Sequence, residues 1–137
     1  MSILDKILPP RREGAKKILL VDDEPHLQEI MESLLSGVKC EILLAGDGKE
    51  GVEMARKHLP AMIVMDMNMP VLSGVDATRL IRNDPRTRRI PILMCTSMSM
   101  MADAEKCFGA GATDYITKPL DPDQFKSKVA KILDKAP

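Results

Sequence analysis

Residues 18–24, ILLVDDE, place four apolar residues directly before three acidic ones. A short apolar run that ends at polar residues is typical of a strand buried on both faces of a parallel sheet. Four further apolar runs follow along the chain, at residues 42–45, 61–65, 90–95 and 112–116. Segments with helical periodicity separate these runs, so the sequence predicts five parallel strands joined by crossover helices.

Five segments predict helices, near residues 25–35, 48–58, 73–84, 99–109 and 121–133. Ser73 and Asp121 suit N-caps, Asp76 is expected to reach back to the Ser73 cap, and Pro85 forbids continuation of that helix. The inward helix faces are expected to carry Leu27, Ile30, Met31, Leu34, Leu35, Val52, Ala55, Ala77, Leu80, Ile81, Met100, Met101, Ala104, Cys107, Phe108, Phe125, Val129, Ile132 and Leu133. Right-handed crossovers then predict an α/β, doubly wound fold, in which ligands bind beyond the carboxyl ends of the strands.

The composition fits one domain with no excess charge of either sign. The 137 residues contain 20 Lys and Arg against 20 Asp and Glu, so we expect no direct binding of nucleic acid. No apolar stretch approaches the roughly 20 residues that span a bilayer, and no signal pattern opens the chain. These absences predict a cytoplasmic protein without membrane insertion. The three cysteines, Cys40, Cys95 and Cys107, are expected to be buried thiols.

Residues 1–16 are interpreted as an N-terminal extension, and residues 17–135 as the folded domain. The extension contains a short apolar patch, two prolines and a charged run. It is either a flexible leader or a short amphipathic turn that docks on a partner or on the domain itself.

Polar residues follow four of the predicted strands at their carboxyl ends. Asp22 and Asp23 follow the first run, and Asp66 follows the third. Thr96 and Lys118 follow the fourth and the fifth. Because the carboxyl ends of parallel strands share one edge, we expect three carboxylates, a hydroxyl and an ammonium to converge there.

Each of these residues has a purely structural alternative when taken singly. Asp22 or Asp23 could cap the next helix, and Asp66 could begin a turn. Two carboxylates about 4 Å apart repel by roughly 4 kcal/mol at an effective dielectric of about 20, so three together favour a bound cation. Mg²⁺ uses one or two carboxylates, a carbonyl and several waters, which leaves room for a phosphoryl oxygen. The joint placement therefore favours phosphoryl transfer onto a carboxylate.

Four motifs carry a family resemblance in their order and spacing: ILLVDDE at 18–24, IVMDMNMP at 63–70 with Gly74 shortly after, MCTS at 94–97, and GATDYITKP at 111–119. They resemble the receiver domains of two-component response regulators, in particular the single-domain, chemotaxis-regulator-like kind. The resemblance covers about residues 17–135. It implies a flavodoxin-like (βα)₅ fold with the strand order 2-1-3-4-5.

Carried over by position, the resemblance implies a phospho-acceptor and a metal site. Asp66 is the implied phospho-acceptor. The implied ligands of Mg²⁺ are the carboxylates of Asp22, Asp23 and Asp66 and the backbone carbonyl of Asn68.

The resemblance also implies a switch around the phosphoryl group. Thr96 is similar to the hydroxyl that moves to this group, and Lys118 is similar to its ion-pair partner. Tyr115 is similar to the aromatic residue that turns inward once Thr96 has moved. The peptide bond before Pro119 is usually cis in the family.

A signalling role follows from the resemblance. A sensor histidine kinase or a histidine phosphotransfer protein is the implied phosphodonor. Phosphorylation is expected to shift the surface of the fourth helix, fifth strand and fifth helix toward a downstream protein target, with the chain a monomer or a weak dimer through that face. No output domain follows Pro137, so the signal leaves by protein contact, or the chain is a fragment of something longer. Catalysis is limited to the domain's own phosphoryl transfer and autodephosphorylation.

Two positions depart from the usual family pattern. Ser97 stands where the family often has Ala or Gly, a small change that should leave room for the phosphoryl group. Met98 is apolar where many members carry a polar residue that orients the attacking water. We therefore expect slow autodephosphorylation.

Three other classes of protein fit these residues less well. A pseudo-receiver would share the fold and only bind, but every acidic position is filled here. An aspartyl-phosphate phosphatase usually needs a second Asp two residues after the first, where this chain has Asn68. A flavin-binding module would need a phosphate loop after the first strand, where Asp22, Asp23 and Glu24 repel phosphate.

Overall fold

A computed structural model describes residues 15–97 and 101–136 of the chain. The expectations for residues 1–14, for Met98 and Met100, and for the side chain of Met101 lie outside the described residues. Across the described part, no helix combines the length and the apolar character that crossing a bilayer requires.

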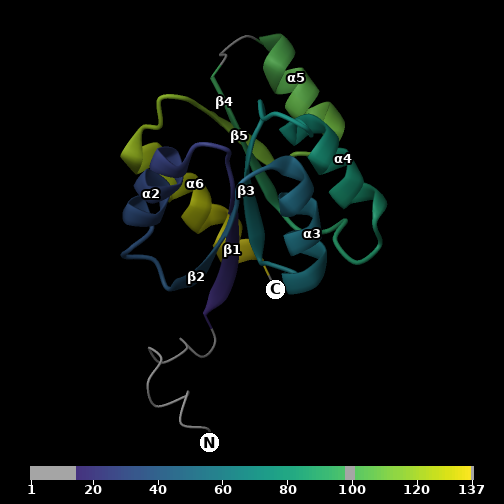
Figure 1. The fold of residues 1–137 in the computed structure, drawn as a ribbon. Helices are drawn as coiled ribbons and strands as arrows, with labels where there is room; N and C mark the ends of the chain where they lie inside the picture. The colour runs from purple at the N-terminus through teal and green to yellow at the C-terminus, as the bar shows by residue number, and fades with distance from the viewer. Residues whose placement is uncertain (1–14, 98–100, 137) are drawn as a thin grey trace, which may run out of the picture.

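Five parallel strands alternate with helices along the chain, and their order in the sheet is β2-β1-β3-β4-β5. The strands are β1 (Lys16–Val21), β2 (Cys40–Ala45), β3 (Met62–Asp66), β4 (Ile92–Thr96) and β5 (Asp114–Thr117). The helices are α2 (Pro25–Leu34), α3 (Gly48–His58), α4 (Gly74–Asn83), α5 (Met101–Ala110) and α6 (Pro122–Lys135). The predicted doubly wound, flavodoxin-like fold is therefore confirmed (Figure 1).

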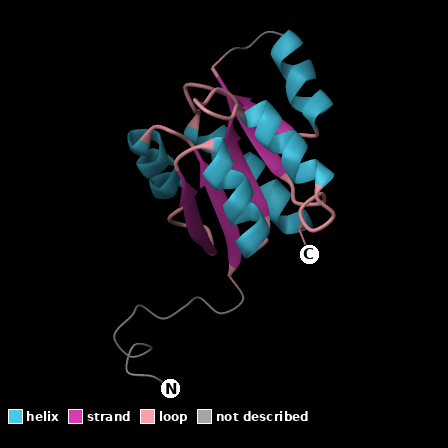
Figure 2. Ribbon diagram, turned by 45° about the vertical axis from the view of Figure 1, so that its right-hand side comes forward, coloured by secondary structure: helices cyan, strands magenta, loops and turns pink. Residues whose placement is uncertain are grey.

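The sheet lies between two layers of helices. Helices α2 and α6 cover one face, and α3, α4 and α5 cover the other (Figures 1 and 2). Alternate residues of β1 enter the two cores: Ile18 and Leu20 pack toward α2 and α6, while Leu19 and Val21 pack toward the other three helices. Burial on both faces explains why the strands are continuous apolar runs.

Local signals set the helix ends as predicted. The Ser73 hydroxyl accepts the backbone N–H of Asp76 at 3.1 Å, and the Asp121 carboxylate accepts that of Gln124 at 2.9 Å. Helix α4 ends at Asn83, two residues before Pro85. The prediction that Asp76 reaches back to the Ser73 cap is wrong. The Asp76 carboxylate pairs with the Arg79 guanidinium at 3.4 Å instead.

Three residues predicted to face inward are exposed instead. Ile30, Leu80 and Phe108 are 39%, 42% and 48% exposed. Each is the direct sequence neighbour of a fully buried residue, and neighbours on a helix point about 100° apart. Because each helix packs on only one face of the sheet, its buried stripe is too narrow to cover both the buried residue and its exposed neighbour.

Two strands begin two residues later than their apolar runs predict. Strand β4 starts at Ile92, after Pro91, and β5 starts at Asp114. Proline has no N–H for the ladder, which accounts for the later start of β4. The three cysteines are buried as predicted, and burial raises the pKa of the Cys95 thiol to about 12.

Candidate functional site

The parallel register of β1 and β3 brings two acidic residues together. Val21 pairs with Met65 across the two strands, so the residues that follow them, Asp22 and Asp66, come to the same level at the carboxyl edge. Asp66 is the last residue of β3, and Asp22 is the first residue after β1.

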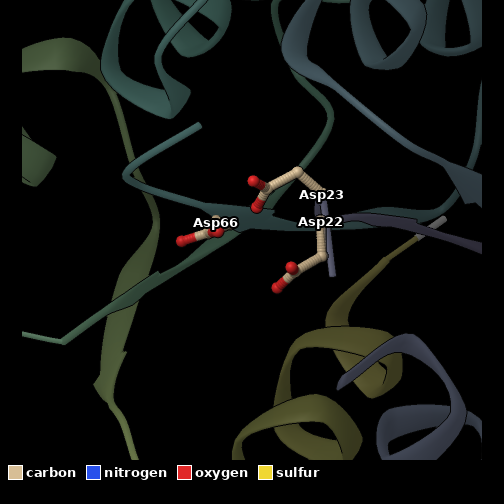
Figure 3. Close-up of side chains that lie close together, drawn as sticks. All are labelled: Asp22, Asp23 and Asp66. Carbon is tan, nitrogen blue, oxygen red and sulfur yellow. The ribbon is translucent and has the colours of Figure 1, made fainter. Parts of the chain in front are cut away.

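Three carboxylates converge at this edge, as the sequence predicted. Oxygens of Asp22, Asp23 and Asp66 all lie within 4.8 Å of one another (Figure 3). Asp22 and Asp66 are buried, whereas Asp23 is exposed. The cluster is thus open to solvent on the Asp23 side.

Backbone N–H groups hold the two buried carboxylates in place. Asp22 Oδ1 accepts the N–H of Glu24 at 2.9 Å, and Asp66 Oδ1 accepts the N–H of Asn68 at 3.3 Å. Gln28 of α2, which was not predicted as a site residue, donates its amide to the backbone carbonyls of Asp22 and Ala45, each at 2.9 Å. It therefore ties the end of β1 to the end of β2 beside the cluster.

Lys118 supplies the positive charge of the site. Its Nζ lies 3.2 Å from Asp66 Oδ1 and 3.4 Å from Asp22 Oδ2. Its backbone N–H donates to the Thr96 carbonyl at 2.7 Å, and the peptide bond from Lys118 to Pro119 is cis, as the resemblance implies.

Burial and charge act in opposite directions on the ionisable groups. Burial raises the pKa of Asp22 and of Asp66, although the Lys118 ammonium and the backbone hydrogen bonds lower both in part. Burial also acts to lower the pKa of Lys118, but the carboxylates of Asp66 and Asp22 outweigh it and raise that pKa. The site contains three carboxylates and one ammonium, and every atom in it that could bind a metal is an oxygen. Such a set of ligands fits a hard divalent cation such as Mg²⁺.

Thr96 and Tyr115 occupy the adjoining strands. Thr96 is the buried last residue of β4 and pairs with Thr117 of β5 in the register. Tyr115 lies lower on β5, paired with Met94. Its half-buried ring contacts the Phe108 ring of α5 edge to face, with centroids 5.9 Å apart. The structure therefore connects Tyr115 directly to α5.

Residues 18–130 match the family described as "Response regulator receiver domain". The chain is a receiver domain. As such it belongs to two-component signalling and is a signalling domain, not a conventional enzyme.

Relatives of the receiver domain differ in length. The probable transcriptional regulator ycf27 of Guillardia theta is 31% identical over 121 residues, covering 88% of this chain and 46% of that protein. The polar-differentiation response regulator DivK of Brucella anthropi is 28% identical over 118 residues, covering 86% of this chain and 96% of DivK. The chain spans about half the length of the transcriptional regulators that it matches.

Solved structures share the fold of the receiver domain. A putative response regulator from Chloroflexus aurantiacus has a TM-score of 0.84 at 31% identity, covering 88% of this chain and 99% of that one. The receiver domain of the sensor histidine kinase PA1611 from Pseudomonas aeruginosa has a TM-score of 0.81 at 33% identity, with the same two coverages. The PA1611 structure has a magnesium ion coordinated in its active-site cleft.

Two features of the loop after Asp66 were not predicted from the sequence. Val71 is 87% exposed and adopts a φ of +71°, while the N–H of Leu72 donates to the Pro70 carbonyl at 2.8 Å. This is a γ-turn with a β-branched residue in the left-handed region, a strained arrangement. Gly74 packs so closely that a Cβ atom there would lie 2.0 Å from the Asp66 carbonyl oxygen. Valine by itself carries no sequence signal for such a turn.

Replacing Asp66 with asparagine is expected to stabilise the metal-free receiver domain at pH 7. The folded-state pKa of Asp66 lies above its ordinary 3.8, so the folded state binds the proton more tightly than the unfolded state does. The associated stability is present at low pH and is lost as the pH rises from 3.8 through the folded-state pKa. We expect the variant to gain on the order of 1 kcal/mol in urea unfolding with EDTA.

Two controls accompany this measurement. Mg²⁺ should raise the stability of the wild type more than that of Asp66→Asn, because the variant lacks one carboxylate ligand. Asp76→Asn, at an exposed ion pair, should change stability by less than about 0.5 kcal/mol. A less stable Asp66→Asn protein in EDTA would contradict the electrostatic account.

Proposed function

We propose that this receiver domain is a phospho-acceptor switch in which Asp66 takes a phosphoryl group. The observation that carries the proposal is the placement of the buried Asp66 carboxylate at the acidic cluster, 3.2 Å from the Lys118 ammonium. A buried carboxylate beside a fixed cation is oriented as a nucleophile, and the same cation can stabilise charge on the transferred group.

The phosphodonor we propose is a phosphohistidine on a sensor histidine kinase or a histidine phosphotransfer protein. An Asp66 carboxylate oxygen attacks phosphorus, the P–O bond forms, and the P–N bond to the donor imidazole breaks. The Lys118 ammonium, which lies beside Asp66 and Asp22, neutralises negative charge on the phosphoryl oxygens. Asp22, Asp23, Asp66 and the backbone carbonyl of Asn68 are the proposed Mg²⁺ ligands. When bound, Mg²⁺ supplies positive charge to the transferred phosphoryl oxygens.

The proposed output passes through Thr96 and Tyr115. Phosphorylation adds negative charge and acceptor oxygens near the Thr96 hydroxyl, which moves toward them. Tyr115 then turns inward and leaves its edge contact with Phe108, which changes the α5-β5-α6 surface. We propose that this surface controls a downstream protein, with the chain a monomer or a weak dimer through it.

The domain limits and the lifetime of the phosphoryl group are also proposals. The sequence predicted an extension at residues 1–16 and a domain at 17–135; because Lys16 is the first residue of β1, we place the start of the receiver domain one residue earlier, and we place the protein in the cytoplasm. Slow autodephosphorylation rests on the apolar Met98, which lies outside the described residues.

Incubation with acetyl phosphate and Mg²⁺ tests the proposed function. Intact-protein mass spectrometry should show one added phosphoryl group on the wild type, which disappears at alkaline pH because acyl phosphates are base-labile. Asp66→Asn should show none, and Asp76→Asn, at the surface of α4, should be labelled like the wild type. A wild type that takes neither the phosphoryl group nor Mg²⁺ would identify a pseudo-receiver that only binds partners.

A further inference from the structure

Two hollows lie at the amino-terminal edge of the sheet, opposite the acidic cluster. One, of about 380 Å³, is lined in part by Arg89, Lys128, Lys131 and Lys135. The other, of about 400 Å³, includes Lys16, Lys17, Arg86 and Arg89 in its lining. Because both include Arg89 and Pro91, they adjoin, and we call the two together the basic end. They lie where β1, β4 and β5 begin and where α6 ends.

Charge is strongly segregated at the basic end. Seven of the 20 Lys and Arg residues of the chain line the two hollows, against a single carboxylate, Asp114, of its 20 acidic residues. The neutral net charge of the chain therefore hides a local positive field at the edge farthest from the phospho-acceptor.

Some of these cations serve the fold. Lys16 Nζ donates to the backbone carbonyls of Leu133 and Ala136 at the end of α6. Lys128 Nζ pairs with Asp114 at 2.8 Å. Arg86 pairs with Asp84 at 2.9 Å. These contacts engage three of the seven cations.

Four cations remain without a hydrogen bond or ion pair among residues 15–97 and 101–136: Lys17, Arg89, Lys131 and Lys135. The dipole of α6 favours lysine in its last turn, but Lys16 already serves the terminal carbonyls there. Lys131 and Lys135 stand four residues apart on one helix, a like-charge spacing that destabilises a helix. Arg89 lies outside α6 altogether. The fold alone therefore does not explain this concentration of charge.

We propose that the hollow lined by Arg89, Lys128, Lys131 and Lys135 binds an oligophosphate anion, that is, two or more linked phosphate groups. Several cations around one hollow of about 380 Å³ suit a small ligand with closely spaced negative charges. Lysine and arginine both bind phosphate oxygens well. Thr113 accepts the Ile92 N–H at 3.0 Å, so its hydroxyl proton is available to a ligand oxygen.

The lining disfavours two other polyanions. The hollow lined by Arg89, Lys128, Lys131 and Lys135 contains no aromatic residue, and the other contains only the His58 imidazole, so nucleic acid would find no row of stacking side chains. Carboxylates of an acidic peptide alternate in direction along an extended backbone and do not concentrate in one small hollow. Residues 1–14 carry three cations and two carboxylates, so they cannot neutralise the basic end.

The test is a calorimetric and NMR titration of the full chain with inorganic tripolyphosphate in Mg²⁺-free buffer with EDTA. We expect saturable binding, with the amide shifts of residues 89, 113, 128, 131 and 135 moving together. The double variant K131E/K135E should bind about tenfold more weakly or worse. A double variant of equal charge, K106E/K126E, changes exposed lysines that line neither hollow and should stay within about twofold of the wild type.

The possible outcomes each decide the proposal. Failure of the wild type to saturate, or equal weakening in both double variants, would overturn it. Tighter binding of a polyglutamate peptide or of single-stranded DNA than of tripolyphosphate would reject the ligand class. K131Q/K135Q, which removes charge without reversing it, serves if K131E/K135E does not fold. Binding should persist in Asp66→Asn, so this result stands apart from the proposed phosphorylation.

Discussion

Gly74→Ala is expected to lower the free energy of unfolding by about 3 kcal/mol and to disturb the acidic site. The added Cβ would lie 2.0 Å from the Asp66 carbonyl oxygen and 2.9 Å from the Met67 Cα. Both are backbone atoms, so no side chain can rotate away. The start of α4 would have to move off β3, which breaks the hydrogen bond from the Gly74 N–H to the Met67 carbonyl at 2.9 Å.

Urea unfolding and beryllofluoride binding measure the two effects of Gly74→Ala. The matched control is Gly109→Ala in α5, where an added Cβ meets nothing within 4 Å. That change should stabilise the protein by about 0.5–1 kcal/mol, because alanine favours a helix over glycine. If Gly74→Ala were as stable as the wild type and still bound beryllofluoride, the close approach of α4 to Asp66 would be needed neither for stability nor for the acidic site.

Arg82→Met is expected to cost about 3 kcal/mol of unfolding free energy. The half-buried guanidinium donates to three backbone carbonyls: Gly111 at 2.8 Å, Ile90 at 2.7 Å and Arg88 at 3.1 Å. It thereby joins α4 to the segment before β4 and to the turn before β5. Burial lowers the pKa of Arg82, a sign that its charge is partly desolvated. Methionine fills similar volume but leaves the three carbonyls without this donor.

The control for Arg82 lies one turn earlier in the same helix. Arg79 is exposed and pairs only with the exposed Asp76 at 3.4 Å, so Arg79→Met should change stability by less than about 0.5 kcal/mol. Urea unfolding of both variants at one pH gives the comparison. Equal, small losses in the two would show that the carbonyl contacts of Arg82 contribute little.

Much of the fold was predictable because its signals are local. The apolar runs of the strands, the Ser73 and Asp121 caps and the stop before Pro85 depend on a few neighbouring residues. The acidic cluster was predictable for a related reason. Asp22 and Asp66 directly follow parallel strands, and the register of such strands brings their ends to one level.

Other features could not be predicted, because they depend on which surfaces meet. Helical periodicity placed Ile30, Leu80 and Phe108 inward, yet each lies beyond the narrow stripe that its helix buries. The amide contacts of Gln28 need the ends of β1 and β2 to be in place. Val71 acquires its strained turn only in the loop between Asp66 and α4.

The sequence by itself determined the five apolar strands, their order in the chain and the acidic residues at their ends, since these follow from local composition and spacing. The sequence also placed Lys118 at this edge, but only the tertiary structure decided that its ammonium contacts both Asp22 and Asp66, since these contacts join residues 96 and 52 positions apart in the chain. The tertiary structure also decided that the basic end forms. The net charge of a sequence does not say where its charges lie in space, and only folding brings Lys17, Arg89 and Lys131 to one edge of the sheet.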